Sequence, residues 1–177
     1  DLLFPNATSN DTDRRPMFAT YLTPNRAERA LQLFPGSRFV CMVRDGVATI
    51  ESRLAHHTLG KHSFREQCRE WADWGVFYQW ARGRSDCLIV RHEQLTADPV
   101  GSMSAVLDFL QLPQSTLPET VLTGSRFHPT PEAARPIWQR WSRENRALFQ
   151  EICGPAMRAL GYVLPWQREE TQNHDAA

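Results

Sequence analysis

The sequence has 177 residues, 41% of them apolar and 10% aromatic, which is enough for one domain with a hydrophobic core and excludes a disordered or fibrous chain. The 20 Lys and Arg residues balance the 20 Asp and Glu residues, so no overall positive field favours nucleic acid as a partner. The apolar runs are too short to cross a bilayer, so we expect no membrane span.

The first predicted elements are a helix and a strand. Thr23 and the proline after it are typical of a helix N-terminus, and the Pro-Gly pair at 35–36 ends that helix. Residues 38–43, RFVCMV, form a short apolar run that is rich in strand formers. Such a run predicts a strand covered on both faces within a parallel sheet.

Two helices are predicted next. Asp45 can cap a helix that places Val47, Ile50 and Leu54 on one face. Ser63 and Glu66 have the spacing of a capping box, which predicts the start of a second, longer helix. The apolar residues of this longer helix recur every three or four positions and predict a core-facing stripe: Phe64, Cys68, Trp71, Trp74, Tyr78 and Ala81.

The second half of the chain continues the alternation of helices and strands. Residues 87–91, CLIVR, read as a second buried strand, and Asp98 followed by proline opens another helix. Residues 112–136 read as a long loop, and a final helix runs from about Ser142 to Gly161. The order predicts an α/β domain over residues 1–166, with a parallel sheet flanked by helices, an unassigned segment at 1–22 and a disordered polar tail at 167–177.

The four cysteines, Cys41, Cys68, Cys87 and Cys153, form no CxxC pair and lie within apolar segments. We interpret them as buried thiols, with a disulfide or a metal site as the alternative. No set of acidic, histidine or cysteine residues has the spacing of a zinc site, so no metal is expected.

Arg44 is the first candidate for ligand binding. It follows the first strand directly, and in parallel sheets ligands bind outside the carboxyl ends of the strands. The next helix offers its N–H groups and positive dipole end to an anion, and Ser52 offers a hydroxyl. These groups suit a phosphate. The alternative is that Arg44 forms a surface ion pair with Asp45 or Glu51, and that Ser52 has no role.

Three segments carry a resemblance to a known family. RFVCMVRDGVATIES, CLIVRHEQLTADPVGSMSAVLDFLQLP and MRALGY resemble the sulfotransferases that use 3'-phosphoadenosine 5'-phosphosulfate (PAPS). In that family an arginine ends the strand and a serine follows eight residues later. The residues of these segments are most similar to those of tyrosylprotein sulfotransferases and related bacterial sulfotransferases. The resemblance covers about residues 23–162.

The resemblance implies roles for six residues. Arg44 and Ser52 would bind the 3'-phosphate of PAPS or of its product PAP. His92 stands where the family usually has a tyrosine that touches the nucleotide, so one contact is altered. In the long loop, Ser125 and Arg126 resemble the nucleotide-binding serine region, and Arg135 resembles the basic residue that closes over the cofactor; ordinary loop chemistry is the alternative for these three.

One part of the family pattern is missing from the sequence. The resemblance implies a P-loop-containing nucleoside triphosphate hydrolase-like fold, in which a strand and a glycine-containing loop hold the 5'-phosphosulfate upstream of the arginine. The nearest segment, GKHS at 60–63, has Ala55 where the loop needs its first glycine. We therefore expect an incomplete, C-terminal portion of a longer sulfotransferase, unless residues 1–21 replace the missing part.

The implied function is transfer of a sulfuryl group from PAPS to a hydroxyl or phenol of a small molecule or a protein tyrosine, without a metal and with an unassigned catalytic base. The alternative is an inactive nucleotide-binding or interaction module that retains only the 3'-phosphate half of the site. The segment near Gln79 has no cysteine to pair with Cys87 as in the lumenal enzymes, which favours the cytoplasm over a secretory lumen.

Overall fold

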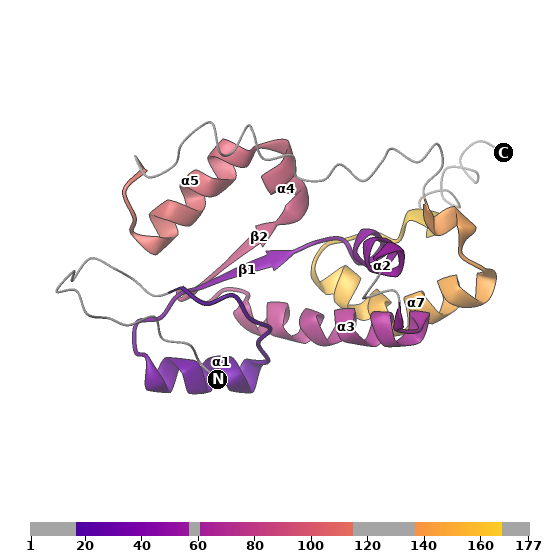
Figure 1. Ribbon diagram of the computed structural model, residues 1–177, viewed down its shortest axis with the longest axis horizontal. Coiled ribbons are helices and arrows are strands. Elements are labelled where there is room, and N and C mark those ends of the chain that lie inside the picture. Colours follow the sequence, from indigo (N-terminus) through magenta and orange to yellow (C-terminus); the bar gives the residue numbers. More distant parts are fainter. Residues whose placement is uncertain (1–16, 57–60, 115–136, 168–177) are drawn as a thin grey trace.

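The computed structural model describes residues 17–56, 61–114 and 137–167. The predictions for residues 168–177 and for most of the loop at 112–136 lie outside these residues. Helices and strands alternate as predicted, in an α/β arrangement. In chain order the elements are α1 (Pro24–Leu33), β1 (Phe39–Val43), α2 (Gly46–Ala55), α3 (Phe64–Ala81), β2 (Cys87–Arg91), α4 (His92–Ala97), α5 (Pro99–Leu110), the 3-10 helix η3 (Ile137–Arg140) and α7 (Arg143–Ala159) (Figure 1).

The helices begin where their capping residues predict. The Asp45 carboxylate accepts a hydrogen bond of 3.0 Å from the Ala48 N–H at the start of α2. At the start of α3, Ser63 and Glu66 form both bonds of the capping box. Each cap satisfies backbone N–H groups that have no partner within the helix. The predictions for both helix starts are therefore confirmed.

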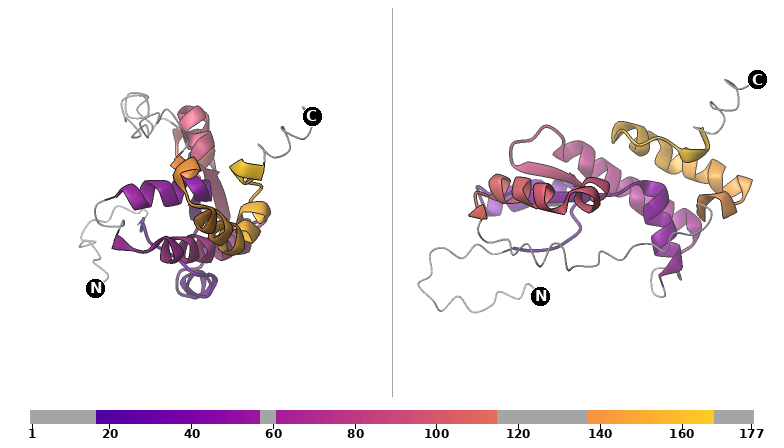
Figure 2. Two further views of the ribbon diagram at one scale, coloured as in Figure 1. Left: turned by 90° about the vertical axis from the view of Figure 1, so that its right-hand side faces the viewer. Right: turned by 90° about the horizontal axis from the view of Figure 1, so that it is seen from above.

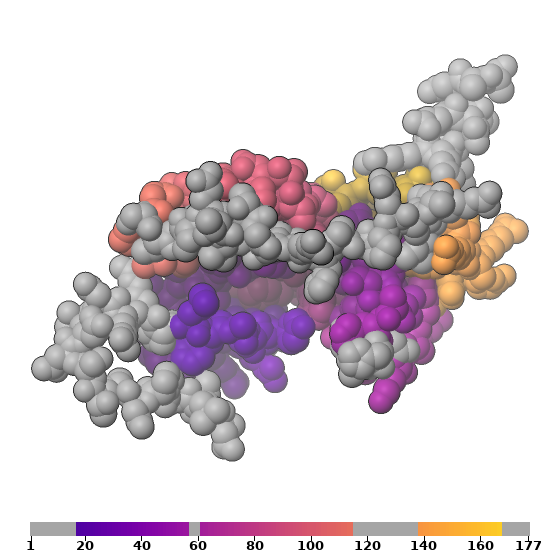
Figure 3. Space-filling view, turned by 45° about the horizontal axis from the view of Figure 1, so that its top comes forward, coloured from indigo at the N-terminus to yellow at the C-terminus, as the bar shows by residue number. Residues whose placement is uncertain are grey.

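β1 and β2 form a parallel pair in which Val43 lies opposite Arg91. Helices α4 and α5 lie on one side of this pair, and α1 and α3 lie on the other (Figures 1 and 2). In the space-filling view, the pink surface of α5 lies above and the indigo surface of α1 lies below (Figure 3). The parallel register brings the carboxyl ends of both strands to the same edge, next to α2 and α4.

The two faces of β1 differ in coverage. Cys41 and Val43 point into the core, whereas Val40 is 37% exposed and Met42 is 44% exposed. The prediction that both faces are covered is wrong for this strand. Helices α4 and α5 pack mainly against β2. Their cluster consists of Val90, Leu95 and Val106 with Leu88, Met103 and Leu110 at its border.

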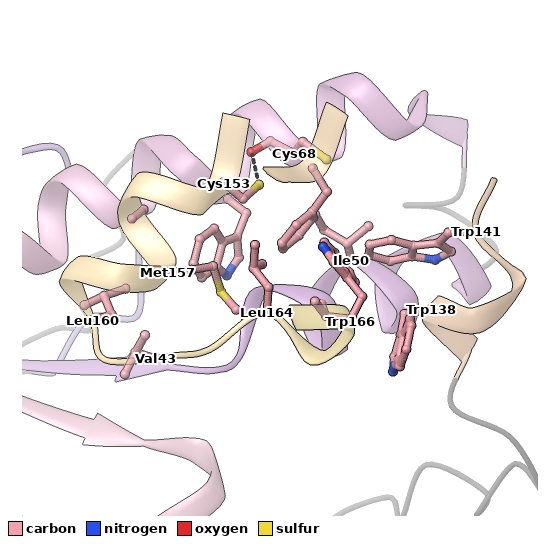
Figure 4. Packing of buried hydrophobic residues seen from close by; sticks show 14 residues of the cluster. Val43, Ile50, Cys68, Trp138, Trp141, Cys153, Met157, Leu160, Leu164 and Trp166 are labelled. Atoms are coloured by element: carbon pink, nitrogen blue, oxygen red, sulfur yellow. Dashed lines mark hydrogen bonds between the residues drawn. The ribbon is translucent and has the colours of Figure 1, made fainter. Parts of the chain in front are cut away.

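The main core lies where α2, α3, η3 and α7 meet, with α3 and α7 side by side (Figure 4). The largest fully buried side chains that α3 and α7 contribute to this core are Trp71, Phe149 and Met157. On α7, Phe149, Ala156 and Met157 are buried, whereas Leu148 is only half-buried. The whole cluster comprises Val43, Val47, Ile50, Cys68, Trp71, Trp138, Trp141, Phe149, Cys153, Ala156, Met157, Leu160, Leu164 and Trp166.

All four cysteines are free thiols, and three of them are buried, which confirms the interpretation for Cys41, Cys68 and Cys153. The Cys153 thiol donates to the backbone carbonyl of Cys68 over 3.3 Å (Figure 4). Burial raises the pKa of Cys41 to about 11 and the pKa of the half-buried Cys87 to about 12. These thiols are therefore protonated at neutral pH and are poor nucleophiles.

Candidate functional site

Arg44 and His92 lie next to each other at the carboxyl edge of the sheet. Arg44 follows the last residue of β1 and His92 follows the last residue of β2, and those two last residues, Val43 and Arg91, are partners in the parallel register. Neighbouring strands are about 4.8 Å apart. The fold thus brings together two of the residues predicted from the sequence, from positions 48 residues apart.

His92 is half-buried beside this arginine. Burial lowers the pKa of His92, and the positive charge of Arg44 lowers it further, against a smaller opposing effect of Glu93. The imidazole is therefore neutral at pH 7 and can donate one hydrogen bond, accept one, or stack on a base. It adds no positive charge to the site at that pH.

The Arg44 guanidinium has no hydrogen bond or salt bridge with any residue that the structure describes. The surface ion pairs with Asp45 or Glu51, on which the alternative interpretation depends, are not formed. The Arg44 charge nevertheless lowers the pKa of both carboxyls as a minor effect, so the three groups are near one another. A half-buried arginine with open donors is suited to a planar or tetrahedral anion.

The N-terminus of α2 is capped as the sequence predicts. The Asp45 carboxylate accepts the Ala48 N–H, so one of the free N–H groups at this helix end is already engaged. Ser52 lies seven residues after Asp45, about two turns along and on the same face of α2, where its hydroxyl is exposed. An anion at this corner would meet the Arg44 and Ser52 side chains beside this helix end.

A cavity of about 460 Å³ lies on the neighbouring face of α2. Burial raises the pKa of its Glu51 to about 6, and the Oε1 atom of this side chain is buried without a hydrogen-bond partner. Arg44 and Ser52 do not line the cavity. The cavity is also lined by Arg91, which already donates to the Leu160 carbonyl, and two carboxyls, Asp45 and Glu51, oppose an anion there.

Two charged residues near the corner were not predicted from the sequence. Arg140 of η3 lies close enough to Glu51 for its charge to lower the pKa of that carboxyl slightly. Glu93 accepts hydrogen bonds from the Asp45 backbone N–H and from the Tyr162 hydroxyl. No local motif marks Arg140. Glu93 lies in the HEQL segment that resembles the family pattern, but its hydrogen-bond partners lie far away in the sequence, so its contacts were not predicted.

Other predicted features have different outcomes. Ser125, Arg126 and Arg135 lie outside the described residues. Among residues 17–56, 61–114 and 137–167, no three His, Cys, Asp or Glu side chains gather as metal ligands would. In the same ranges, no helix has the length and apolarity needed to cross a membrane.

Comparison with known proteins identifies the family. A family profile described as "Sulfotransferase family" matches residues 4–116, which is more than half of the 177 residues. The chain belongs to the sulfotransferase family. This membership confirms the resemblance read from the residues around Arg44 and the α/β fold expected with it.

Curated relatives share part of this sulfotransferase chain. It is 36% identical over 98 residues to protein-tyrosine sulfotransferase 2 of Gallus gallus, covering 51% of this chain and 26% of the relative. It is 31% identical over 99 residues to the protein-tyrosine sulfotransferase of Drosophila melanogaster, covering 52% and 20%. It is 29% identical over 153 residues to protein-tyrosine sulfotransferase A of Caenorhabditis elegans, covering 74% and 40%. The chain thus spans between 20% and 40% of the length of these relatives.

A solved structure shares the fold. The sulfotransferase domain from the curacin biosynthetic pathway matches 80% of this chain and 59% of its own length, with a TM-score of 0.53 and 22% sequence identity. At this identity the match supports the arrangement of the elements and not a shared substrate.

Proposed function

We propose that this chain carries the 3'-phosphate-binding half of a PAPS site in a sulfotransferase that acts on a hydroxyl or phenol. The observation that supports the proposal best is the Arg44 guanidinium, which lies at the carboxyl edge of the sheet beside His92 and has no partner among the described residues. An arginine at a ligand-binding edge whose donors are not engaged by the described residues can offer them to a phosphate.

The chemistry of these side chains fits a nucleotide 3'-phosphate. Arg44 can donate two parallel N–H bonds to phosphate oxygens, and Ser52 can donate its hydroxyl. A neutral His92 can stack on the adenine or form one hydrogen bond, in place of the tyrosine that is usual in the family. We propose Ser125, Arg126 and Arg135 as further contacts from the loop at 112–136.

PAPS supplies the sulfuryl group that is transferred, and the reaction needs no metal in this proposal. The corner around Arg44 binds and orients the nucleotide, so its effect is on affinity and on placement of the sulfuryl group. The catalytic base and the phosphosulfate loop are not assigned to any residue. A protein tyrosine is the favoured acceptor because the curated relatives are named protein-tyrosine sulfotransferases.

The second candidate function is a nucleotide-binding module without transfer activity. It would need only the groups at the Arg44 corner, which bind a phosphate and supply no catalytic base. Both functions use the Arg44 corner. An assay for transfer of the sulfuryl group from PAPS to a tyrosine peptide distinguishes them. The cytoplasm remains the predicted compartment.

Calorimetric titration with adenosine 3',5'-bisphosphate tests the proposal. We expect the native chain to bind, Arg44→Ala to lose about 2 kcal/mol, and Ser52→Ala to lose about 1 kcal/mol, because a charged and a neutral hydrogen bond to phosphate are removed. Arg29→Ala is the matched control, since Arg29 is an exposed arginine on α1 far along the chain from the corner. A folded chain that does not bind, or an Arg29→Ala loss as large as that of Arg44→Ala, would contradict the proposal.

A further inference from the structure

Glu93 connects three parts of the chain that are distant in sequence. Its Oε1 atom accepts the Asp45 backbone N–H over 2.8 Å, and its Oε2 atom accepts the Tyr162 hydroxyl over 3.0 Å. The first bond spans 48 residues and the second spans 69 residues. Both carboxylate oxygens of this exposed side chain on α4 are therefore engaged in specific contacts.

The bond to Asp45 acts directly on the candidate site. The Asp45 N–H belongs to the peptide group that joins Arg44 to Asp45. Because a peptide group is planar, holding its N–H also holds the Arg44 carbonyl and restricts the backbone of Arg44. Glu93 thus fixes the point from which the Arg44 side chain extends.

The other end of the connection is anchored in the core. After α7, the Tyr162 N–H bonds to the Met157 carbonyl over 2.8 Å and the Gly161 N–H bonds to the Arg158 carbonyl over 3.0 Å. Gly161 has a φ of 74°, as a helix end of this kind requires. Met157 is fully buried, so the turn that carries Tyr162 cannot move independently of the core.

Arg91 strengthens the same anchor from the end of β2. Its guanidinium lies over the Tyr162 ring, 4.6 Å from the ring centroid, and it donates a hydrogen bond to the Leu160 carbonyl. Tyr162 is therefore held at its backbone by Met157 and at its ring by Arg91, and its hydroxyl donates to Glu93. A continuous set of contacts leads from the core, through Tyr162 and Glu93, to the peptide group after Arg44.

We propose that Glu93 is a positioning residue that orients Arg44 for its anion. The proposal rests on the proposed function of the Arg44 corner. It adds that the turn after α7, which carries Tyr162, helps to hold Arg44 in place through Glu93. A purely electrostatic role makes the opposite prediction, because Glu93 is a negative charge near an anion site. If only its charge mattered, removal of Glu93 would strengthen anion binding. If its positioning of Arg44 is the larger effect, removal of Glu93 weakens anion binding.

The test compares two substitutions of Glu93 by calorimetric titration with adenosine 3',5'-bisphosphate. We expect Glu93→Ala to weaken binding roughly threefold to tenfold, since it removes the bond that holds the Asp45 N–H. Glu93→Gln keeps an oxygen for that N–H and an amide that can donate to Tyr162, so its affinity should stay within about twofold of the native chain or exceed it. Gln94→Ala, at the exposed position next to Glu93, is the matched control.

A double variant, in which Glu93→Ala is combined with Arg44→Ala, separates an effect on positioning from a loss of stability. If Glu93 acts through Arg44, Glu93→Ala should cause no further loss of affinity in an Arg44→Ala chain, whereas independent effects would add. Thermal unfolding of each variant shows that the folded state is retained. A folded Glu93→Ala chain that binds as tightly as the native chain, or more tightly, would overturn the proposal.

Amide hydrogen exchange tests the connection without a ligand. The Asp45 N–H should be protected in the native chain and exchange roughly tenfold faster in Glu93→Ala. If the native chain fails to bind the nucleotide but this protection pattern holds, the proposed function fails and the connection stands. An unprotected Asp45 N–H in the native chain would overturn the connection itself.

Discussion

The α2–α3–α7 core and the β1–β2 sheet differ in how completely they bury their apolar side chains. Phe149 and Met157 are fully buried in the core, whereas Met42 on the sheet is 44% exposed. The Arg44 corner lies where the two regions meet, directly after Val43, which is itself part of the core cluster. The corner is therefore held from the helical side, and the exposed face of β1 contributes little to holding it.

The largest expected difference between the two regions is in stability. Phe149→Ala should reduce the free energy of unfolding by about 3–5 kcal/mol, because it removes a fully buried aromatic ring and leaves a cavity. Met42→Ala, on the exposed face of β1, should cost less than about 1 kcal/mol. Urea denaturation of both variants measures these values. Equal losses would contradict the assignment of stability to the helical core.

The close approach of α3 and α7 gives a second, smaller effect. A Cβ atom at Gly75 would lie 2.6 Å from the Ala156 Cβ, so Gly75→Ala should force the helices apart and cost roughly 1–3 kcal/mol. Gly154→Ala is the control on α7, because its Cβ would meet only the side chains of Arg158 and Gln150, at 3.4 and 3.9 Å. It should be neutral or stabilising by up to about 1 kcal/mol, since Ala favours a helix more than Gly does. A reversed order would contradict the packing described.

The smallest effect is a pH dependence at the border between the core and the corner. The pKa of Glu51 is raised from 4.5 to about 6, chiefly by burial, so ionising this carboxyl destabilises the folded chain. The native chain should lose stability as the pH rises through this window, and Glu51→Gln should not. We expect the variant to unfold about 2 °C higher above pH 6 and to lose this advantage below pH 4.5. A difference that does not change with pH would contradict this.

Much of the fold could be predicted from local signals in the sequence. The apolar runs at 39–43 and 87–91 and the caps at Asp45 and Ser63 each depend on residues within a few positions of one another. The exposure of Val40 and Met42 could not be predicted, because an apolar run does not reveal which of its faces a distant helix covers. The short helix α4 was missed because no side chain caps it.

The candidate site could be predicted only in part. Arg44 and His92 could be found because each ends a recognisable strand, and the parallel register then brings them together. Ser52 was predicted from the family spacing and lies on α2. The part played by Glu93 could not be read from the sequence, since its two partners lie 48 and 69 residues away. Capping of α2 by Asp45 was predicted, and the structure shows that it engages the Ala48 N–H.

The most direct test of the central claim is the ratio of affinities for adenosine 3',5'-bisphosphate and adenosine 5'-monophosphate, which differ only in the 3'-phosphate. If Arg44 binds that phosphate, the native chain should prefer the bisphosphate by roughly 30-fold or more. Arg44→Ala should lose most of this preference while retaining the native unfolding temperature within a few degrees. Equal affinity of the native chain for the two nucleotides, or an unchanged preference in Arg44→Ala, would contradict the account.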